Sequence, residues 1–212
     1  MRKYVKQISI LLCLLMIVTI FANPVPAQAF DKKAAKKNVT VSYKRFSDGI
    51  LAVYKNKNNF AVTLSGTLSF KDADGKSLSK ETQKNLCLTK KATATFFFKT
   101  PLDGSGNPMI YDSYKGSYSV GKSKFKSRIS KINIATTLQP IQTDIAAINL
   151  SGKKLSNINV TFVFYDANDT ALMCKTKYLN CYDINQVDQF SISYAGEHRT
   201  PSKVKTYINW AY

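Results

Sequence analysis

The sequence contains one histidine, one tryptophan and only 13 Asp and Glu side chains, against 31 Lys and Arg. The lone histidine, His198, has no second histidine or reactive cysteine with which to form a nucleophile–base pair. It lies in a loop between Glu197 and Arg199, where a solvated side chain is the simpler prediction. No glycine-rich phosphate-binding loop is present. We therefore expect no enzymatic activity and no catalytic residues.

Carboxylates are too few and too scattered to suggest a cofactor or metal site. Asp72 and Asp74 lie close together, but both fall in a predicted hairpin turn, where aspartate satisfies backbone groups. Counted from Asp72, the twelfth position is Gln83 rather than the bidentate glutamate of a calcium loop. Cys174 and Cys181 lack the second pair of ligands that a structural zinc site needs. The sequence predicts no metal and no cofactor.

Runs of apolar residues are also short. Ile8–Phe21, at 14 residues, is shorter than the roughly 20 that span a bilayer. It follows the basic residues Arg2, Lys3 and Lys6 and precedes the small-x-small triplet Ala27–Ala29, the pattern of a cleaved signal peptide over residues 1–29. We expect a secreted or extracellular protein, associated with the cell envelope, with no transmembrane segment in the mature chain.

Cleavage after Ala29 leaves an odd number of cysteines: Cys87, Cys174 and Cys181. At least one is then unpaired within the chain. Buried free thiols are the favoured interpretation, and a disulfide between Cys174 and Cys181 is the alternative.

Basic residues dominate the charge, at +18 for the whole sequence. Such a charge favours polyanionic neighbours such as teichoic acids, acidic glycans or anionic lipid headgroups, and it also keeps an exported protein soluble. Composition does not choose between these two roles, and it gives no reason to expect a specific nucleic-acid partner.

A repeat appears at an offset of 94 residues, where Leu68–Gly75 aligns with Phe162–Asp169. Both segments show period-two alternation, which is typical of a half-buried strand. In the first copy the core face carries Val62, Leu64, Gly66, Leu68 and Phe70, and in the second it carries Ile158, Val160, Phe162 and Phe164. Asp74-Gly75 then predicts a hairpin turn.

Further short strands are expected on both sides of these segments, and no stretch after residue 30 shows a helical period. We expect an all-β fold of two tandem, small Ig-like β-sandwiches. The predicted organisation is a basic, flexible lead-in at 30–37, a first sandwich at 38–121, a basic linker at 122–130 and a second sandwich at 131–212. The alternation also predicts that Phe96 and Phe98 enter the core while Phe97 faces outward, into a groove or interface between the domains.

Phe162-Val163-Phe164-Tyr165-Asp166 resembles the FxLYD-type domain of bacterial exported proteins, with Phe164 where that family has Leu. The preceding Asn149–Leu155 resembles the family's N-x-S-x-x-x-L entry to the same strand. The first copy departs further, reading Leu68–Asp72. The resemblance implies a small Ig-like sandwich that acts as a non-catalytic module of the cell envelope.

A basic and aromatic segment joins the predicted domains. Charge and ring stacking together hold polyanions or sugars, so this segment is the sequence's candidate site for an anionic cell-wall polymer. Its members are Tyr111, Tyr114, Lys115, Lys122, Lys124, Lys126, Arg128 and Lys131. The alternative is a last strand with buried tyrosines followed by a solvated linker. The leading expectation for function is a non-enzymatic binding or scaffolding protein of the cell surface, whose partner is an anionic cell-wall polymer or another envelope protein.

Overall fold

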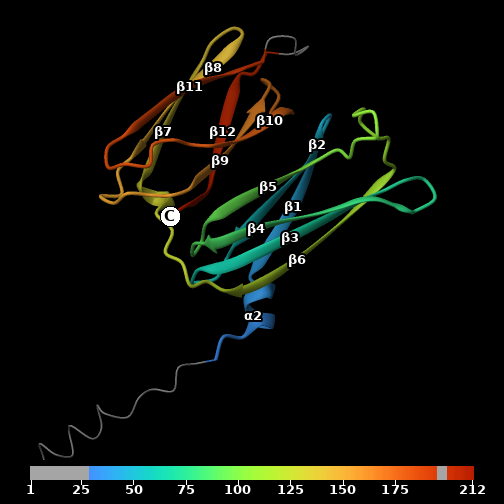
Figure 1. The fold of residues 1–212 in the computed structure, drawn as a ribbon, viewed down its shortest axis with the longest axis horizontal. Coiled ribbons are helices and arrows are strands. Elements are labelled where there is room, and N and C mark those ends of the chain that lie inside the picture. The colour runs from blue at the N-terminus through green and yellow to red at the C-terminus, as the bar shows by residue number, and fades with distance from the viewer. Residues whose placement is uncertain (1–28, 195–199) are drawn as a thin grey trace, which may run out of the picture. The chain divides into compact units, whose positions relative to one another are not determined.

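The computed structural model describes residues 29–194 and 200–212 (Figure 1). The chain divides into two units, Met1–Asp31 and Lys32–Tyr212, and the second contains every element described below. Residues 1–28 of the expected signal peptide and the loop holding His198 lie outside the described residues. None of the helices described is long and apolar enough to cross a bilayer.

The described chain is almost entirely β-structure, which confirms the predicted all-β class. The elements are α2 (Lys32–Lys37), β1 (Val39–Phe46), β2 (Gly49–Asn56), β3 (Val62–Lys71), β4 (Ser77–Leu88), β5 (Thr93–Lys99), β6 (Ser113–Lys122), η1 (Ile129–Lys131), β7 (Ile132–Leu138), β8 (Gln142–Asn149), β9 (Ile158–Tyr165), β10 (Ala171–Tyr178), β11 (Val187–Ser193) and β12 (Lys203–Ala211).

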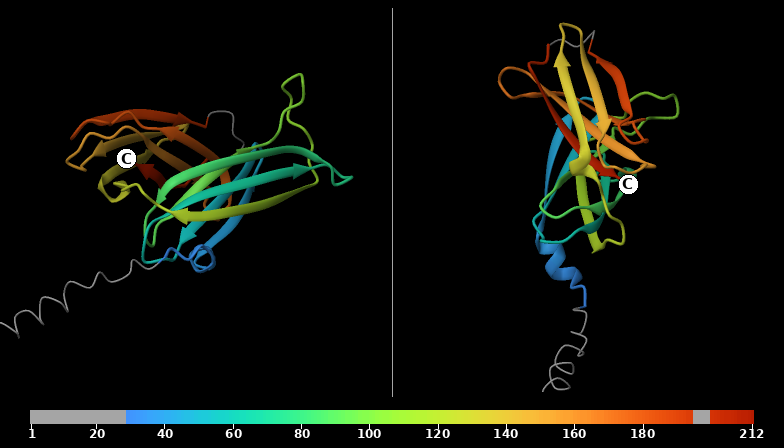
Figure 2. Two further views of the ribbon diagram at one scale, coloured as in Figure 1. Left: turned by 60° about the horizontal axis from the view of Figure 1, so that its bottom comes forward. Right: turned by 90° about the vertical axis from the view of Figure 1, so that its left-hand side faces the viewer.

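The strands form four antiparallel sheets, two in each half of the chain (Figure 1). The first half contains β1-β2-β5 and β4-β3-β6, and the second contains β7-β8-β11 and β10-β9-β12. Strand order is therefore the same in the two halves. Within each half the inner faces of the two sheets pack together as a sandwich, and Figure 2 shows both sandwiches from two further sides.

Matching polar contacts occupy matching places in the two halves. The side chain of Asn56 at the end of β2 donates to the carbonyls of Phe60, Leu88 and Thr89, and accepts from the backbone of Asn58. Asn149 at the end of β8 binds the carbonyls of Lys153 and Tyr182 and accepts from Ser151. Each buried asparagine therefore joins the end of its strand to the following loop and to a segment about 33 residues later in the chain, through satisfied hydrogen bonds.

The hairpins after β3 and β9 also correspond. Hydroxyls pair across the strands, Thr67 with Thr82 at 2.8 Å and Thr161 with Thr176 at 3.0 Å. The Asp72 carboxylate accepts the backbone N–H of Lys76, as predicted for a turn residue, and Asp166 accepts that of Thr170. Local side-chain bonds of this type close turns.

The lead-in was predicted to be flexible, and this was wrong for Lys32–Lys37, which form α2. Six residues are too few to stabilise a helix alone. Tertiary contacts hold it: Ala35 is buried and its carbonyl accepts a hydrogen bond from the Asn58 side chain. The sequence shows no helical period because Ala35 is the only buried residue of this short helix.

Strand β3 alternates between buried and half-buried residues along its whole length, as predicted. Strand β9 does not: all eight of its residues are buried. Its core face was predicted correctly, but the other face, with Asn159, Thr161, Val163 and Tyr165, is also withdrawn from solvent. The reason is that this second face packs against the first sandwich.

A second, smaller apolar cluster forms this junction between the sandwiches. Phe46 and Leu51 of the first sandwich pack with Val163, Tyr165 and Cys174 of the second. Phe97 packs against the same cluster, which confirms its predicted place between the domains, while Phe96 and Phe98 are buried in the core as predicted.

Asn209 lies at the centre of the polar part of the junction and is 1% exposed. Its Oδ1 accepts from the backbone N–H and the hydroxyl of Thr95, at 2.7 and 2.9 Å. Its Nδ2 donates to Asn159 and Thr161 at 2.7 and 2.9 Å, and its carbonyl accepts from the Asn85 side chain at 2.6 Å. Every hydrogen-bonding group of this side chain is therefore satisfied.

The position of Asn209 follows from an irregularity in β12. Pairing with β9 shifts register between Ile208 and Trp210, so Asn209 is the extra residue of a β-bulge. Strand β6, which pairs with β3 at the corresponding place, shows no such shift. A bulge redirects a side chain out of the regular alternation, and here it turns an amide toward the edge strand β5.

We predict that Asn209→Ala lowers the free energy of unfolding by about 3 kcal/mol, because it leaves several buried polar groups without partners. Urea unfolding followed by circular dichroism measures the change. Asn38→Ala, which removes an exposed side-chain bond to the Ala34 carbonyl, is the matched control and should cost less than about 0.5 kcal/mol. Equal stability of the Asn209 variant and the control would contradict the prediction.

Gly66 in β3 leaves room for a tyrosine from the opposite sheet. A Cβ at this position would clash with the hydroxyl of Tyr54 and would lie 2.8 Å from the ring of Phe96. We predict that Gly66→Ala destabilises the chain by about 2 kcal/mol through overpacking, and that Tyr54→Phe in the same chain recovers part of the loss.

The matched control is Gly104→Ala, since an added Cβ there meets no atom within 4 Å. Thermal and urea unfolding should show little change for this variant. A Gly66 variant as stable as the Gly104 variant would show that the core adjusts without cost.

Candidate functional site

The structure divides the predicted basic and aromatic segment into two faces. Strand β6 alternates, so its tyrosines turn toward the first sandwich and Lys115 faces outward. The ring of Tyr111 is buried 4.8 Å from that of Phe70, and the ring of Tyr114 lies 5.7 Å from that of Tyr43. These tyrosines are part of the packing of the first sandwich. Lys115 lies on the opposite face of β6, and Lys122 shares the face of Tyr114 and Tyr118 but lies exposed at the end of the strand.

The basic members of the segment are also separated. Lys115, Lys122, Lys124 and Lys131 are exposed. Lys126 and Arg128 line a hollow of about 530 Å³ that also includes Lys90 and Cys87. The structure therefore brings only two of the eight predicted residues to one concave surface.

A larger groove, of about 910 Å³, runs along the junction beside this hollow. Its walls come from both sandwiches: β1, β2 and the loop before β5 on one side, and β12 on the other. Groove and hollow share Thr89, Lys90, Ile129 and Ser130, so they form one continuous surface, which we name the basic groove. Neither lining contains an acidic residue.

Six cations line the basic groove: Lys55, Lys90, Lys91, Lys126, Arg128 and Lys205. Among the described residues none of them pairs with a carboxylate; the ion pairs that do form are Lys154 with Asp183 and Lys203 with Asp169, elsewhere on the second sandwich. Lys91 donates to the Lys57 carbonyl at 2.6 Å. Unpaired cations facing one groove produce a local positive potential that attracts anions.

Hydroxyls and apolar side chains share the rest of the larger groove. The hydroxyls come from Thr40, Ser42, Thr93, Ser130 and Thr206, and the apolar side chains include Val41, Val53 and Ile208. The ring of Tyr207 also belongs to the lining, but the ammonium of Lys205 lies over it at 5.1 Å from the ring centre. Phe125 lines the hollow, is 49% exposed and has its ring centre 5.7 Å from that of Tyr212. The groove therefore offers charge and hydrogen bonds together with one exposed ring.

Sequence reasoning missed this groove because its cations lie far apart in the chain. Lys55, Lys90 and Lys205 come from β2, the β4–β5 loop and β12. No local pattern joins them, and only the packing of two outer sheet faces brings them together.

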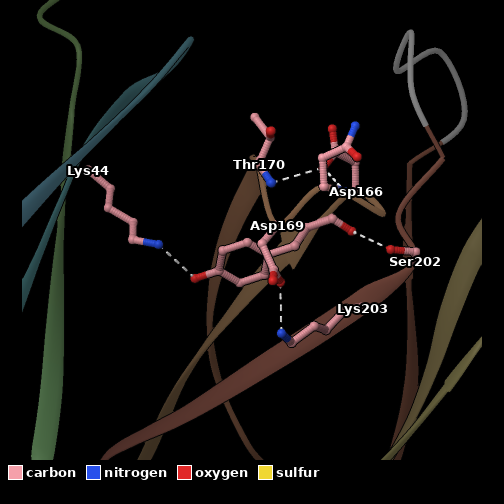
Figure 3. A network of polar contacts seen from close by, with 8 residues as sticks. Lys44, Asp166, Asp169, Thr170, Ser202 and Lys203 are labelled. Carbon is pink, nitrogen blue, oxygen red and sulfur yellow. Dashed lines mark hydrogen bonds and ion pairs between the residues drawn. The ribbon is translucent and has the colours of Figure 1, made fainter.

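The Tyr165-Asp166 pair of the predicted motif performs structural tasks (Figure 3). The hydroxyl of Tyr165 accepts a hydrogen bond at 3.1 Å from Lys44 of the first sandwich. Asp166 closes the turn through the backbone of Asn168 and Thr170, and beside it Lys203 bonds to Asp169 at 2.8 Å. The motif thus helps join the sandwiches and contributes no reactive group to the basic groove.

The three cysteines are buried and free, which confirms the favoured interpretation over a Cys174–Cys181 disulfide. Burial raises the pKa of the Cys174 thiol to about 12, and burial also raises that of Cys181. A thiol with a raised pKa is protonated near neutral pH and is a poor nucleophile. Within the described residues, no three His, Cys, Asp or Glu side chains are placed to hold a metal ion.

No protein-family model matches the chain, and no curated protein matches it with significant similarity.

We predict that burial of Cys174 makes stability fall in alkaline solution. Above about pH 9 the unfolded chain ionises this thiol, whereas the folded chain keeps it protonated up to about pH 12. The free energy of unfolding should therefore fall by about 2 kcal/mol between pH 9 and pH 10.5 through this group.

Urea unfolding across that range, compared between the native chain and Cys174→Ala, isolates the effect. The variant should lose stability less steeply with rising pH, whatever its stability at pH 7. Parallel pH profiles for the two chains would refute the assignment.

Proposed function

We propose that this chain is an exported, non-enzymatic binding or scaffolding protein of the cell envelope, and that its basic groove holds an anionic polymer. The observation that carries the proposal is the groove itself: six cations, no carboxylate in the lining, and walls from both sandwiches. The expected partner is an anionic cell-wall polymer such as teichoic acid or an acidic glycan.

A polymer suits this surface better than a small anion does. The four lysines of the larger groove are exposed, and an exposed ion pair contributes only about 0.2–1 kcal/mol. A single phosphate would therefore bind weakly, whereas a chain of charges engages several cations and releases several counterions. Hydroxyls between the cations add hydrogen bonds to an extended ligand.

Export is supported by the signal-peptide pattern of residues 1–29, and an envelope location by the basic composition. The resemblance to FxLYD-type modules belongs to the same proposal. The matching strand order, with Asn56, Thr67 and Asp72 corresponding to Asn149, Thr161 and Asp166, supports an origin of the two sandwiches by duplication. In the second sandwich the Tyr-Asp pair of the motif serves the turn and the junction.

The groove replaces residues 111–131 as the preferred location for the anion. The tyrosines of that segment pack against the first sandwich, and Lys115, Lys122 and Lys124 do not line the groove. Lys126 and Arg128 are the members of the segment that keep a role.

We predict that Lys55→Glu, Lys90→Glu and Lys205→Glu, made together, move elution from a heparin column to clearly lower salt and weaken binding to purified wall teichoic acid. The slope of log affinity against log salt should flatten by about 0.7–0.9 for each phosphate group that the variant no longer binds. All three residues are exposed, so folding should be retained, and circular dichroism checks it.

The matched control replaces Lys115, Lys122 and Lys124 by Glu, which gives the same net charge. This control should elute close to the native chain. Weaker binding confined to the control would return the site to the 111–131 segment, and equal weakening in both variants would reduce the binding to net charge, contrary to a specific groove.

A further inference from the structure

A second hollow, of about 570 Å³, lies at the same junction and shares no lining residue with the basic groove. Along β12, Ile208 lines the groove and Trp210 lines this hollow, so the two sites flank Asn209 in the strand. Strands β4 and β5 of the first sandwich and β9, β10 and β12 of the second supply its walls. We name it the aromatic hollow.

Three aromatic side chains line the aromatic hollow. Phe97 packs against the apolar cluster of the junction, which leaves Trp210 and Tyr178 as a pair that the groove lacks. Trp210 and Tyr178 have ring centres 6.4 Å apart with planes inclined at 60°. Tyr178 is 59% exposed, a large value for an aromatic side chain on a strand. The indole N–H of Trp210 donates to Asn157 at 2.9 Å, so the ring is oriented without any ligand.

Charge in the aromatic hollow is positive but not uniform. Lys84, Lys99 and Lys175 are exposed around it, together with the carboxylate of Asp48. Among the described residues none of these lysines forms an ion pair with that carboxylate. Three ammonium groups therefore remain for an anionic group of a ligand.

The other polar groups of the lining already have structural partners. Gln83 donates to the Phe97 carbonyl, Thr95 donates to Asn209, and Asn159 accepts from Asn209. The groups that meet a ligand are consequently the rings of Trp210 and Tyr178, the Tyr178 hydroxyl and three cations, with the Asp48 carboxylate at one side.

This combination identifies a class of ligand. A sugar ring presents an apolar C–H face that packs on an aromatic side chain, while its polar edge needs hydrogen bonds or charge; the rings here supply the first and the lysines the second. We propose that the aromatic hollow binds a carboxylated sugar residue, a hexuronate, within a glycan chain. A polyphosphate would leave both rings unused, and a neutral sugar would leave the three cations without a partner.

Both sandwiches are needed for this site. Lys84, Phe97 and Lys99 come from the first, and Lys175, Tyr178 and Trp210 from the second. The inference goes beyond the groove proposal. It concerns different residues, and it proposes a ligand whose sugar rings pack on aromatic side chains of the protein.

Trp210 is the only tryptophan of the chain, so its fluorescence reports on the aromatic hollow directly. Titration with oligogalacturonate of three to five residues should give a saturable change in emission. Tyr178→Ala, and separately Lys84→Gln with Lys175→Gln, should weaken this binding about tenfold, corresponding to about 1.4 kcal/mol. Lys76→Gln with Lys80→Gln, which removes two exposed cations outside this lining, is the matched control and should bind normally.

The outcomes separate this site from the groove. Retained binding by the Lys55, Lys90 and Lys205 triple variant supports a separate site, and failure of that variant to bind overturns it. No saturable change, an equal response to maltotetraose, or an equal response to polyphosphate would each overturn the hexuronate assignment. None of these three results bears on the basic groove, whose binding is measured separately by retention on heparin.

Discussion

The junction between the sandwiches depends on Asn209, because two polar sheet faces can be buried against each other only if their hydrogen-bonding groups are satisfied. Oδ1 of Asn209 accepts from Thr95 on the edge strand β5, Nδ2 donates to Asn159 and Thr161 on β9, and the backbone carbonyl accepts from Asn85. The same contact covers part of an edge that would otherwise offer unpaired groups to another chain. The residue that performs these tasks is the extra residue of a bulge, with no counterpart in β6.

Both candidate sites arise from this junction rather than from either sandwich alone. Each has walls from the two halves, and their chemistry differs. The basic groove has six cations and several hydroxyls, with Tyr207 under Lys205 and Phe125 as its rings, whereas the aromatic hollow has the neighbouring rings of Trp210 and Tyr178. Apolar contact among Leu51, Val163 and Cys174 holds the halves together between these features. The surfaces available to ligands therefore arise at the junction, where the two halves contribute different residues, and not from features that the two halves share.

Sequence reasoning reached the strands because side-chain alternation in β3 and the core face of β9 is a local property, read within eight or ten residues. The full length of β4, Ser77–Leu88, has no such local signal, because residues 80–85 of that edge strand are polar on both faces. The sequence also predicted only one buried face for β9, whereas Thr161 and Asn159 on the other face are buried as well. A polar face carries no local signal of the partner that buries it. The groove could not be predicted from the sequence for the same reason, because only tertiary packing brings Lys55 and Lys205 onto one surface.

The Gly66–Tyr54 contact has a counterpart that explains why the two halves share so few identities. Position for position in the paired strands, Gly66 corresponds to Val160 and Tyr54 to Ala147, and all of these are buried. The first half combines a large tyrosine on one sheet with a glycine on the other, and the second half combines a valine with an alanine. Such positions exchange only as a pair: grafting Val160 into the first half without also shrinking Tyr54 would force atoms into occupied volume. If the halves arose by duplication as proposed, coupled substitutions of this kind would conserve core volume while erasing residue-by-residue similarity.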